Sequence, residues 1–414
     1  MKKIYTLLFS LFLITCSTSL LAQLDTSGGR YCQEIFSSVT VTSNITYGAA
    51  VNVLGQNQTL AMDIYEPAGD TASMRGVIVF AHGGSFLGGT RTDIDVVSLS
   101  NHFAKMGYLT CSIDYRLLFF PLDSINATKA VVRAVQDMKA AIRFFRKDAA
   151  TSNVYKIHPD YIFAGGSSAG AFMSLHLAYL DQLSEVPAWV NIASLGGLDG
   201  NSGNPGYSSN VNAVINLCGA LGDSAWLVPG DVPLVSLHGT NDQTVPYGSA
   251  IIIVSGAPIM NVDGSASIKI RADNIGVQNP FYTWQGAPHV PYAGTSATAL
   301  AYMDTTVDFI RFFLCTIVAA PSLINSVAER AVANTVLLYP NPASGTVTVD
   351  MRHIPSDGKE ITVNVYDNLG RNVKSISKIY AGKFMMDCSD LSSGIYHVKI
   401  FSTNQESYSK LVKE

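Results

Sequence analysis

Charged residues are scarce in this 414-residue chain, at 14% of positions, and the formal net charge is −4. A chain without bulk basic character has no electrostatic footprint for nucleic acid, so we expect no nucleic-acid partner. Cysteine is also rare: the six cysteines form no Cys/His cluster with the spacing of metal ligands. We therefore expect no catalytic metal and no cofactor.

Long apolar runs are lacking beyond the amino terminus. One run covers residues 4–21 after a short basic start, and a plausible cleavage point follows it. This pattern predicts a signal peptide over residues 1–22. A lipoprotein signal at Cys16 is the alternative, although Thr15 is larger than the residue usually found there. No second apolar run of about 18 residues follows, so we expect no membrane span in the mature chain.

The most informative segment is an apolar strand pattern that leads into Gly166-Ser167-Ser168-Ala169-Gly170 and then into a helical pattern. Gly-x-Ser-x-Gly between a strand and a helix is the pattern of a nucleophile elbow. Side chains at the glycines would collide with backbone in so tight a turn. The hydroxyl stands at a helix N-terminus, where partial positive charge favours an oxyanion. The register predicts Ser168 as the nucleophile, since Ser167 would put Ala169 in place of the second glycine. An ordinary βα loop is the alternative.

A glycine-rich loop over residues 82–89 follows an earlier short apolar strand pattern. Backbone N–H groups of such a loop can turn inward, and two donors aimed at one point form an oxyanion hole. We predict that the N–H groups of Gly83, Gly84 and Ala169 form this hole. A phosphate-binding loop is the alternative, but no Lys-[Ser/Thr] pair follows. We interpret His82 as a structural residue that orients the loop.

The general base and its acid are expected after strand ends, where ligand chemistry collects in open α/β sheets. Asp242 follows one buried strand pattern, and His289 lies in a glycine/proline loop just past another. The order Ser168, Asp242, His289 is that of an α/β-hydrolase triad. Asp223, after the preceding strand, is the alternative acid. We expect His238 to hydrogen-bond locally and to shape the acid loop.

Together these motifs give a resemblance to a known family. Residues from about 35 to 315 resemble an α/β-hydrolase of the esterase/lipase type with an HGG oxyanion loop. The matching motifs are His82-Gly83-Gly84, Asp114-Tyr115-Arg116, Gly166-x-Ser168-Ala169-Gly170, His238-Gly239-x-x-Asp242-x-x-Val245-Pro246 and Gly286-x-x-His289. Ala171 departs from the commoner elbow, which has glycine there, but this is a mild change at a helix start.

The resemblance implies a serine carboxylic-ester hydrolase that works through an acyl-enzyme, on a small-molecule or polymer-linked ester such as a feruloyl, acetyl or polyester substrate. Two other functions stay open. One is a serine peptidase of the prolyl-oligopeptidase type, although no propeller-length region precedes the fold. The other is a non-catalytic binding protein on the same fold.

Strand patterns that alternate with helical patterns predict a doubly wound, mostly parallel α/β sheet over residues 23–316. Residues 38–42 and 62–66 alternate as antiparallel strands at the amino-terminal edge. The apolar stripe over 127–147 predicts a helix that lies on the sheet, and residues 299–313 predict the closing helix.

Three aromatic residues near predicted strand ends, Phe86, Trp226 and Trp284, are candidates for the substrate pocket. Segments 195–209 and 250–280 are expected to determine the size of that pocket, although neither has a chemistry-bearing pattern.

Cys32 and Cys315 bracket the predicted domain, and export permits oxidation. We therefore predict a disulfide between them, with two free thiols as the alternative. Cys111 and Cys218 fall inside predicted core strands and are interpreted as buried free thiols.

Residues 317–335 are predicted to be a linker, and 336–414 to be a small antiparallel β-sandwich, because short alternating segments are separated by Gly and Asn turns. Tyr339-Pro-Asn-Pro342, Asp367-Asn-Leu-Gly370 and Leu391-Ser-Ser-Gly-Ile-Tyr396 resemble the C-terminal sorting domain of the type IX secretion system of Bacteroidetes. The resemblance implies that the type IX machinery is a partner and that the protein is secreted or displayed at the cell surface. A carbohydrate-binding or spacer β-domain is the alternative.

Overall fold

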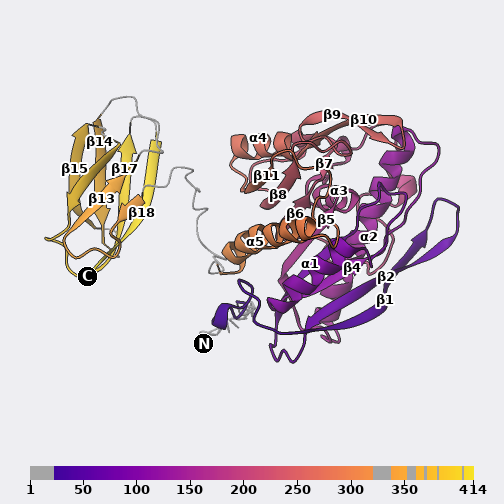
Figure 1. The fold of residues 1–414 in the computed structure, drawn as a ribbon, viewed down its shortest axis with the longest axis horizontal. Helices are drawn as coiled ribbons and strands as arrows, with labels where there is room; N and C mark the ends of the chain where they lie inside the picture. Colours follow the sequence, from indigo (N-terminus) through magenta and orange to yellow (C-terminus); the bar gives the residue numbers. More distant parts are fainter. Residues whose placement is uncertain (1–22, 320–336, 352–359, 368–370, 380–381, 403–404) are drawn as a thin grey trace, which may run out of the picture. The chain divides into compact units, whose positions relative to one another are not determined.

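The computed structural model describes residues 23–319, 337–351, 360–367, 371–379, 382–402 and 405–414. The predicted signal peptide, and the predicted linker from residue 320 onward, lie outside these residues. The chain divides into two compact units, 1–323 and 324–414 (Figure 1). Among the described residues, no helix is both long and apolar enough to cross a bilayer.

An eight-stranded sheet of order β1-β2-β4-β3-β5-β6-β8-β11 lies at the centre of the first unit. At one edge β1 pairs antiparallel with β2, and β2 with β4. From β4 to β11 all neighbours are parallel. The predicted doubly wound, mostly parallel sheet with an antiparallel amino-terminal edge is therefore confirmed. The strands are β1 (Val39–Val51), β2 (Asn57–Pro67), β3 (Arg75–Ala81), β4 (Leu109–Ile113), β5 (Ile157–Ser167), β6 (Ala213–Leu217), β8 (Leu234–Gly239) and β11 (Phe281–Trp284).

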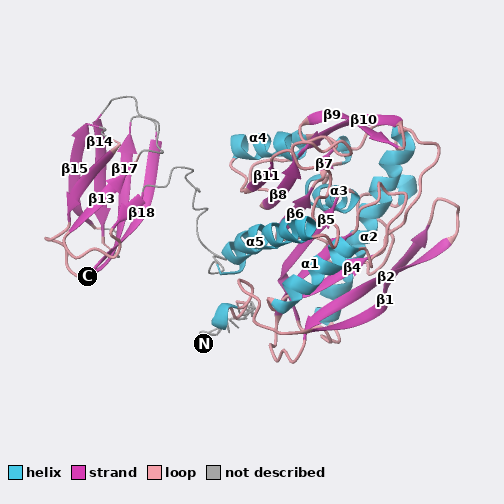
Figure 2. Ribbon diagram, in the orientation of Figure 1, coloured by secondary structure: helices cyan, strands magenta, loops and turns pink. Residues whose placement is uncertain are grey.

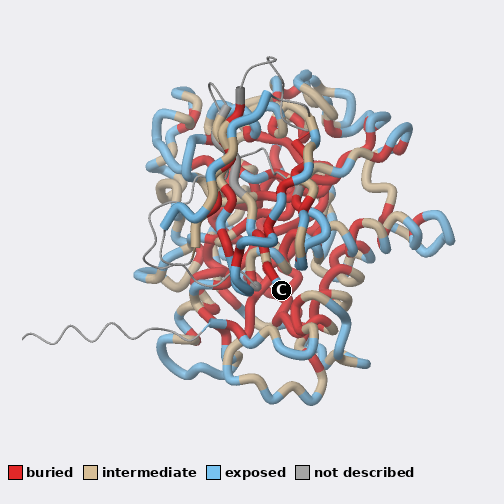
Figure 3. The backbone as a smooth tube through the Cα atoms, turned by 90° about the vertical axis from the view of Figure 1, so that its left-hand side faces the viewer, coloured by how far each residue is buried: buried red, intermediate tan, exposed pale blue. Residues whose placement is uncertain are grey.

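Helices cover both faces of this sheet (Figure 2). On one face Ile78 and Phe80 of β3 belong to one buried core with residues of α1 and α5, and on the other Val77 and Val79 belong to one with residues of α2 and α3. A central parallel strand covered on both sides is buried at every position, and the buried stretches in Figure 3 lie in the interior accordingly. The helices are α1 (Ile94–Lys105), α2 (Ser124–Ala150), α3 (Ala169–Tyr179), α4 (Ser265–Ile275) and α5 (Ala297–Ala319), with 3-10 turns η1 (Ser27–Gly29), η2 (Leu183–Glu185), η3 (Ile192–Leu195) and η4 (Ser224–Trp226).

Two helices are longer than predicted. Helix α2 starts before the apolar stripe because the Asp123 side chain caps it, accepting a hydrogen bond from the Asn126 N–H. Helix α5 continues to Ala319, so the start of the linker at residue 317 was predicted too early. The reason is that Leu314 and Val318, in the last turns of α5, are buried in the core.

A small antiparallel sheet forms where segment 250–280, which has no chemistry-bearing pattern, pairs with a short strand at residues 220–221. Its order is β7-β10-β9, so β9 is an edge strand. The strands are β7 (Ala220–Leu221), β9 (Ser249–Val254) and β10 (Ala257–Gly264).

The second unit is an antiparallel β-sandwich, as predicted. One sheet has the order β12-β13-β16 and the other β15-β14-β17-β18. Val347 from the first sheet and Val363 and Val398 from the second belong to one buried core. The strands are β12 (Leu337–Tyr339), β13 (Thr346–Asp350), β14 (Glu360–Tyr366), β15 (Asn372–Ile379), β16 (Lys383–Asp387), β17 (Gly394–Ser402) and β18 (Gln405–Lys413).

The predicted disulfide is confirmed: Cys32 is bonded to Cys315, with their Cα atoms 5.1 Å apart. It joins the amino-terminal segment to α5, and Arg311 of α5 also donates a hydrogen bond to the Cys32 carbonyl oxygen. Cys111 and Cys218 are buried free thiols, as predicted.

Candidate active site

Ser168 occupies the sharp turn between β5 and α3. Its backbone has φ 53° and ψ −116°, a conformation that costs energy for a residue with a side chain. Two backbone hydrogen bonds hold it there: Ser168 N–H donates to the Leu217 carbonyl oxygen, and its own carbonyl accepts from the Phe172 N–H. The hydroxyl is thereby fixed at the start of α3, outside the carboxyl ends of the strands.

Both elbow glycines are required because the end of β3 passes close to the turn. A Cβ on Gly170 would collide with the Ala81 carbonyl oxygen. A Cβ on Gly166 would lie 2.5 Å from the same oxygen, well inside van der Waals contact. Backbone offers no flexible side chain that could move aside, so the spacing of the motif follows directly from the packing of β3 on β5.

The structure brings Ser168, His289 and Asp242 together from three separate loops. His289 Nε2 lies 2.9 Å from Ser168 Oγ, and His289 Nδ1 lies 2.6 Å from Asp242 Oδ2. The alternative acid, Asp223, instead caps η4 by accepting a hydrogen bond from the Ala225 N–H. Among the described residues, Asp242 is therefore the carboxylate that faces His289.

Asp242 is a buried carboxylate with several donors. Oδ1 accepts hydrogen bonds from the backbone N–H groups of Thr244, at 2.8 Å, and Val245, at 2.9 Å. Burial disfavours its charged form, but the hydrogen bonds from His238 and His289 outweigh this and hold the pKa of Asp242 well below its usual range. The carboxylate therefore stays ionised throughout the neutral range and can orient the imidazole of His289.

His238 is a second histidine on the same carboxylate. Its Nε2 lies 3.1 Å from Asp242 Oδ2 and 3.2 Å from the Val245 carbonyl oxygen. Because both partners are acceptors, Nε2 carries the hydrogen. On the other side of the ring, Nδ1 lies 2.8 Å from Ser265 Oγ, and this hydroxyl oxygen accepts a hydrogen bond from the Asn216 side-chain amide. The sequence predicted a local role for His238 but not this contact with the acid itself.

The loop of residues 82–89 runs beside the nucleophile. A Cβ added to Gly83 would lie 3.3 Å from Ser168 Cβ, and Gly84 has φ +109°, which only glycine adopts without strain. Within the described part of the chain, the backbone N–H groups of Gly83, Gly84 and Ala169 donate no hydrogen bond. Three unoccupied donors in the loop and at the start of α3 suit an oxyanion.

His82 holds this loop to the core. It is fully buried, stacks on the Tyr115 ring at 4.3 Å between centroids, and places Nδ1 2.7 Å from the Gly83 carbonyl oxygen. The Tyr115 hydroxyl donates a hydrogen bond to the His82 carbonyl oxygen. Burial lowers the pKa of His82, which keeps the ring neutral. Its position agrees with the structural role predicted for it.

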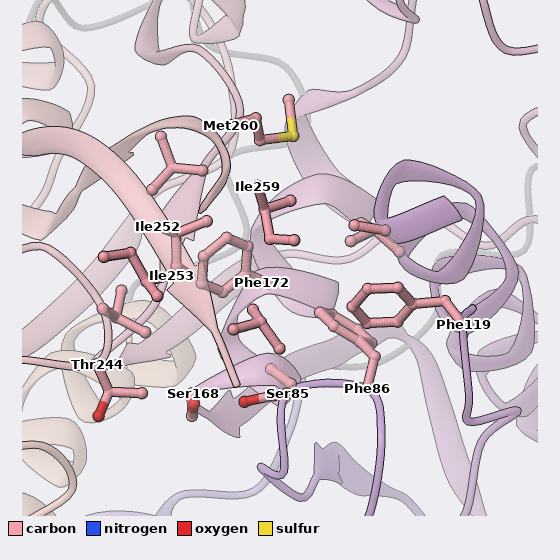
Figure 4. A pocket seen from close by; sticks show the side chains of 16 residues that line it. Ser85, Phe86, Phe119, Ser168, Phe172, Thr244, Ile252, Ile253, Ile259 and Met260 are labelled. Atoms are coloured by element: carbon pink, nitrogen blue, oxygen red, sulfur yellow. The ribbon is translucent and has the colours of Figure 1, made fainter. Parts of the chain in front are cut away.

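Two cavities contain Ser168. One is narrow, about 60 Å³, and its lining carries no charged side chain. The other is wider, about 440 Å³, and includes Asp93, Asp95 and His289 in its wall. In Figure 4, Ile252 and Ile253 form one wall of the narrow cavity, Phe119 lies on the other side and Ser168 lies at its base.

Of the three aromatic residues predicted for the pocket, only Phe86 lines it. Trp284 was predicted wrongly: its side chain points to the opposite face of the sheet and packs on Tyr292 and Tyr302. Trp226 was also predicted wrongly, since it packs edge-on against His176 and contributes to neither cavity. Proximity to a strand end did not reveal which face each ring would join.

The two segments expected to size the pocket behave differently. Segment 250–280 contributes Ile252, Ile253 and Met260 to the narrow cavity, as expected. Segment 195–209 does not reach it and packs instead against β1 and α2, where Ala49 N–H donates to the Ser202 carbonyl oxygen.

Cys218 lies beside Asp242 and His289: its Sγ and one ligand atom of each of these residues lie within 4.8 Å of one another. A metal would require the thiolate form. Burial raises the pKa of Cys218 to about 12, and the other two side chains already bond each other. This group therefore does not fit a metal site.

Two family models match the chain. The BD-FAE model matches residues 62–227, which include the 82–89 loop and Ser168. The model of the secretion system C-terminal sorting domain matches residues 337–414, the β-sandwich. No curated protein matches.

Similar solved structures include forms of esterase 2 of Thermogutta terrifontis. The form phosphorylated by paraoxon is 24% identical, covers 69% of this chain and 97% of its own, and has a TM-score of 0.49. The apo form is 23% identical, covers 68% and 96%, and has a TM-score of 0.48. The propionate-bound form is 22% identical, covers 67% and 96%, and has a TM-score of 0.47.

Proposed function

We propose that this chain, an α/β-hydrolase of the esterase/lipase type followed by a type IX sorting domain, is a carboxylic-ester hydrolase that acts through Ser168, His289 and Asp242. One observation carries the proposal. A relay of 2.6 Å and 2.9 Å contacts runs from a buried carboxylate through an imidazole to a serine in a strained turn. That geometry suits activation of a hydroxyl as a nucleophile.

Acylation begins when Ser168 Oγ attacks the ester carbonyl carbon and His289 Nε2 takes its proton. Asp242 stabilises the imidazolium and holds the tautomer that leaves Nε2 free to accept. The oxyanion is bound by the N–H groups of Gly83, Gly84 and Ala169. The alcohol leaves with the proton from His289, and a water activated by the same imidazole then hydrolyses the acyl-enzyme.

The sorting domain indicates delivery by type IX secretion to the cell surface or the medium. An enzyme there meets esters outside the cell, of which feruloyl, acetyl and polyester esters are the candidate classes. A panel of these esters, with aminoacyl anilides added, separates the candidates. Rapid anilide hydrolysis would instead indicate a peptidase, and inactivity on the whole panel would indicate a binding protein.

The nucleophile is tested by substitution. Ser168→Ala should lower kcat on p-nitrophenyl butyrate by roughly 10⁶-fold, because the covalent step is lost. Wild type treated with an organophosphate ester should carry the phosphoryl adduct on the Ser168 peptide in mass spectrometry. Ser167→Ala is the matched control: Ser167 Oγ accepts from the Tyr292 hydroxyl, away from the relay. Activity in Ser168→Ala together with its loss in Ser167→Ala would transfer the nucleophile to Ser167.

A further inference from the structure

Two segments that contribute to the wall of the narrow cavity, 117–122 and 250–262, contain no charged residue. Phe119 of the first and Ile253 of the second both line the cavity. The start of α2, which directly follows the first segment, contacts the second segment: the Ser124 hydroxyl donates a hydrogen bond to the Ile259 carbonyl oxygen. The two segments therefore belong to one opening.

Large apolar side chains continue from this opening into solvent. Phe120 is 79% exposed, Ile251 59% and Ile253 58%. We call the exposed residues of the two segments and of the adjoining first turn of α2 the apolar rim: Leu118, Phe120, Ile125, Ile251 and Ile253. Single exposed apolar residues are ordinary, but a group of them around a cavity marks an interaction surface.

We propose that the apolar rim seats the enzyme on the surface of an emulsified aliphatic acylglycerol, from which one acyl chain enters the narrow cavity. This inference rests on the proposed function and puts an aliphatic acylglycerol in place of the feruloyl, acetyl and polyester esters considered above. Ile253 is the key observation, because it belongs both to the rim and to the cavity wall that leads to Ser168. The apolar surface is thus continuous from solvent to the nucleophile.

The shape and chemistry of the cavity agree with that occupant. A space of about 60 Å³ without a charged group favours a slim aliphatic chain over a ring that carries hydroxyl groups. The wider cavity, with Asp93 and Asp95, then holds the hydroxyl-bearing alcohol part. Hydrolysis at Ser168 adds one water to the ester and gives one fatty acid and one partial acylglycerol.

The experiment compares the full chain with the double variant Phe120→Ser/Ile251→Ser. Neither residue lines a cavity that contains Ser168. We expect the wild-type rate on tributyrin to rise steeply above the solubility limit, and the variant to lose at least tenfold of that emulsion rate. Its rate on dissolved p-nitrophenyl acetate should stay within twofold of wild type, because the relay and the cavities are unchanged.

The matched control is Phe312→Ser/Ile270→Ser, which removes a phenylalanine at 70% exposure and an isoleucine at 64% exposure from α5 and α4. It should behave like wild type on both substrates. Binding is measured independently of catalysis by co-sedimentation of the Ser168→Ala protein with tributyrin droplets, which are denser than water, with and without the rim substitutions. Failure of the proposed function would abolish p-nitrophenyl acetate hydrolysis yet leave this co-sedimentation result intact.

Three outcomes would overturn the inference. One is an emulsion rate in the rim variant equal to that of wild type. Another is a wild-type rate that stays flat once droplets form. The third is a wild-type dimer in light scattering that the rim substitutions dissociate, which would show that a second copy of the chain covers this face through the β9 edge.

Discussion

At Asp242, backbone and side-chain donors from strand β8 and two loops meet on one buried carboxylate. Such a group tolerates little chemical change, because every oxygen lone pair already has an assigned partner. Its role can therefore be separated sharply from that of Asp223, an exposed helix-capping residue on η4.

Asp242→Asn should lower kcat by about 10⁴-fold, because an amide N–H facing His289 Nδ1 would impose the wrong tautomer. Asp223→Asn should retain most of the wild-type rate, since an asparagine side chain also caps a helical turn. Steady-state kinetics on p-nitrophenyl butyrate measure both. A near-normal kcat for Asp242→Asn together with a large loss of kcat for Asp223→Asn would identify Asp223, after the earlier strand, as the acid.

His238 is expected to position Asp242. His238→Phe removes the Nε2–H donor, so the carboxylate becomes more basic and holds the His289 imidazolium more strongly. The acid limb of the kcat/KM profile should then move to higher pH by about half a unit. Because Asp242 also loses a positioning contact, kcat should fall roughly tenfold.

His238→Gln can offer an amide N–H to Asp242 and should restore part of both changes. His102→Gln is the control, because His102 pairs with Glu34 at the surface, on α1. Superimposable pH profiles for wild type and His238→Phe would leave His238 with a packing role only.

At the scale of elements, the amino-terminal segment is held to the sheet by a few strong contacts instead of by strand pairing. Arg30 bonds both oxygens of Asp70 and the Gly107 carbonyl, and the disulfide joins Cys32 to the last turns of α5. This closes a loop of 283 residues, so the bond restricts most of the unfolded first unit.

Cys32→Ser should therefore lower the stability of the first unit by about 5 kcal/mol, the chain-entropy value for so long a loop. The melting temperature should fall by roughly 10 °C, measured by calorimetry. The kcat at 25 °C should be unchanged, because the bond touches no residue of the relay. Wild type in reductant should melt like the variant. Equal melting temperatures for wild type and Cys32→Ser would contradict a stabilising bond.

The whole molecule consists of two units, each with its own buried core. Every residue of the relay and of both cavities at Ser168 lies in the first unit. We propose that the second unit is a sorting signal for export and that residues 1–22 are a cleaved signal peptide. We also propose that the hydrolase folds without either of them.

A chain that ends at Leu323 should keep wild-type kcat on p-nitrophenyl butyrate, yet should stay inside a host with type IX secretion. Activity in the lysate and in the medium measures the two effects separately. Loss of kcat in a folded, truncated enzyme would mean that the sandwich completes the site. Normal export of the truncated chain would show that the β-sandwich is not needed as a sorting signal.

Local patterns in the sequence were sufficient for the elbow, the glycine-rich loop of residues 82–89 and the sheet. Gly166 and Gly170 follow from the steric demands of one turn, and buried parallel strands must be apolar along their length. Asp242 and His289 could be named because strand order fixes which loops reach the carboxyl edge. The elbow and the buried strands depend on residues near one another in the chain, so the sequence alone determined them.

The tertiary structure decided what depends on the packing of distant segments. It turned Trp284 to the far face of the sheet, placed His238 on the acid and folded residues 249–264 into a hairpin above Ser168. None of these outcomes has a local signature. A side chain's face and its partner are set by which elements exclude water together, and that is a property of the assembled core.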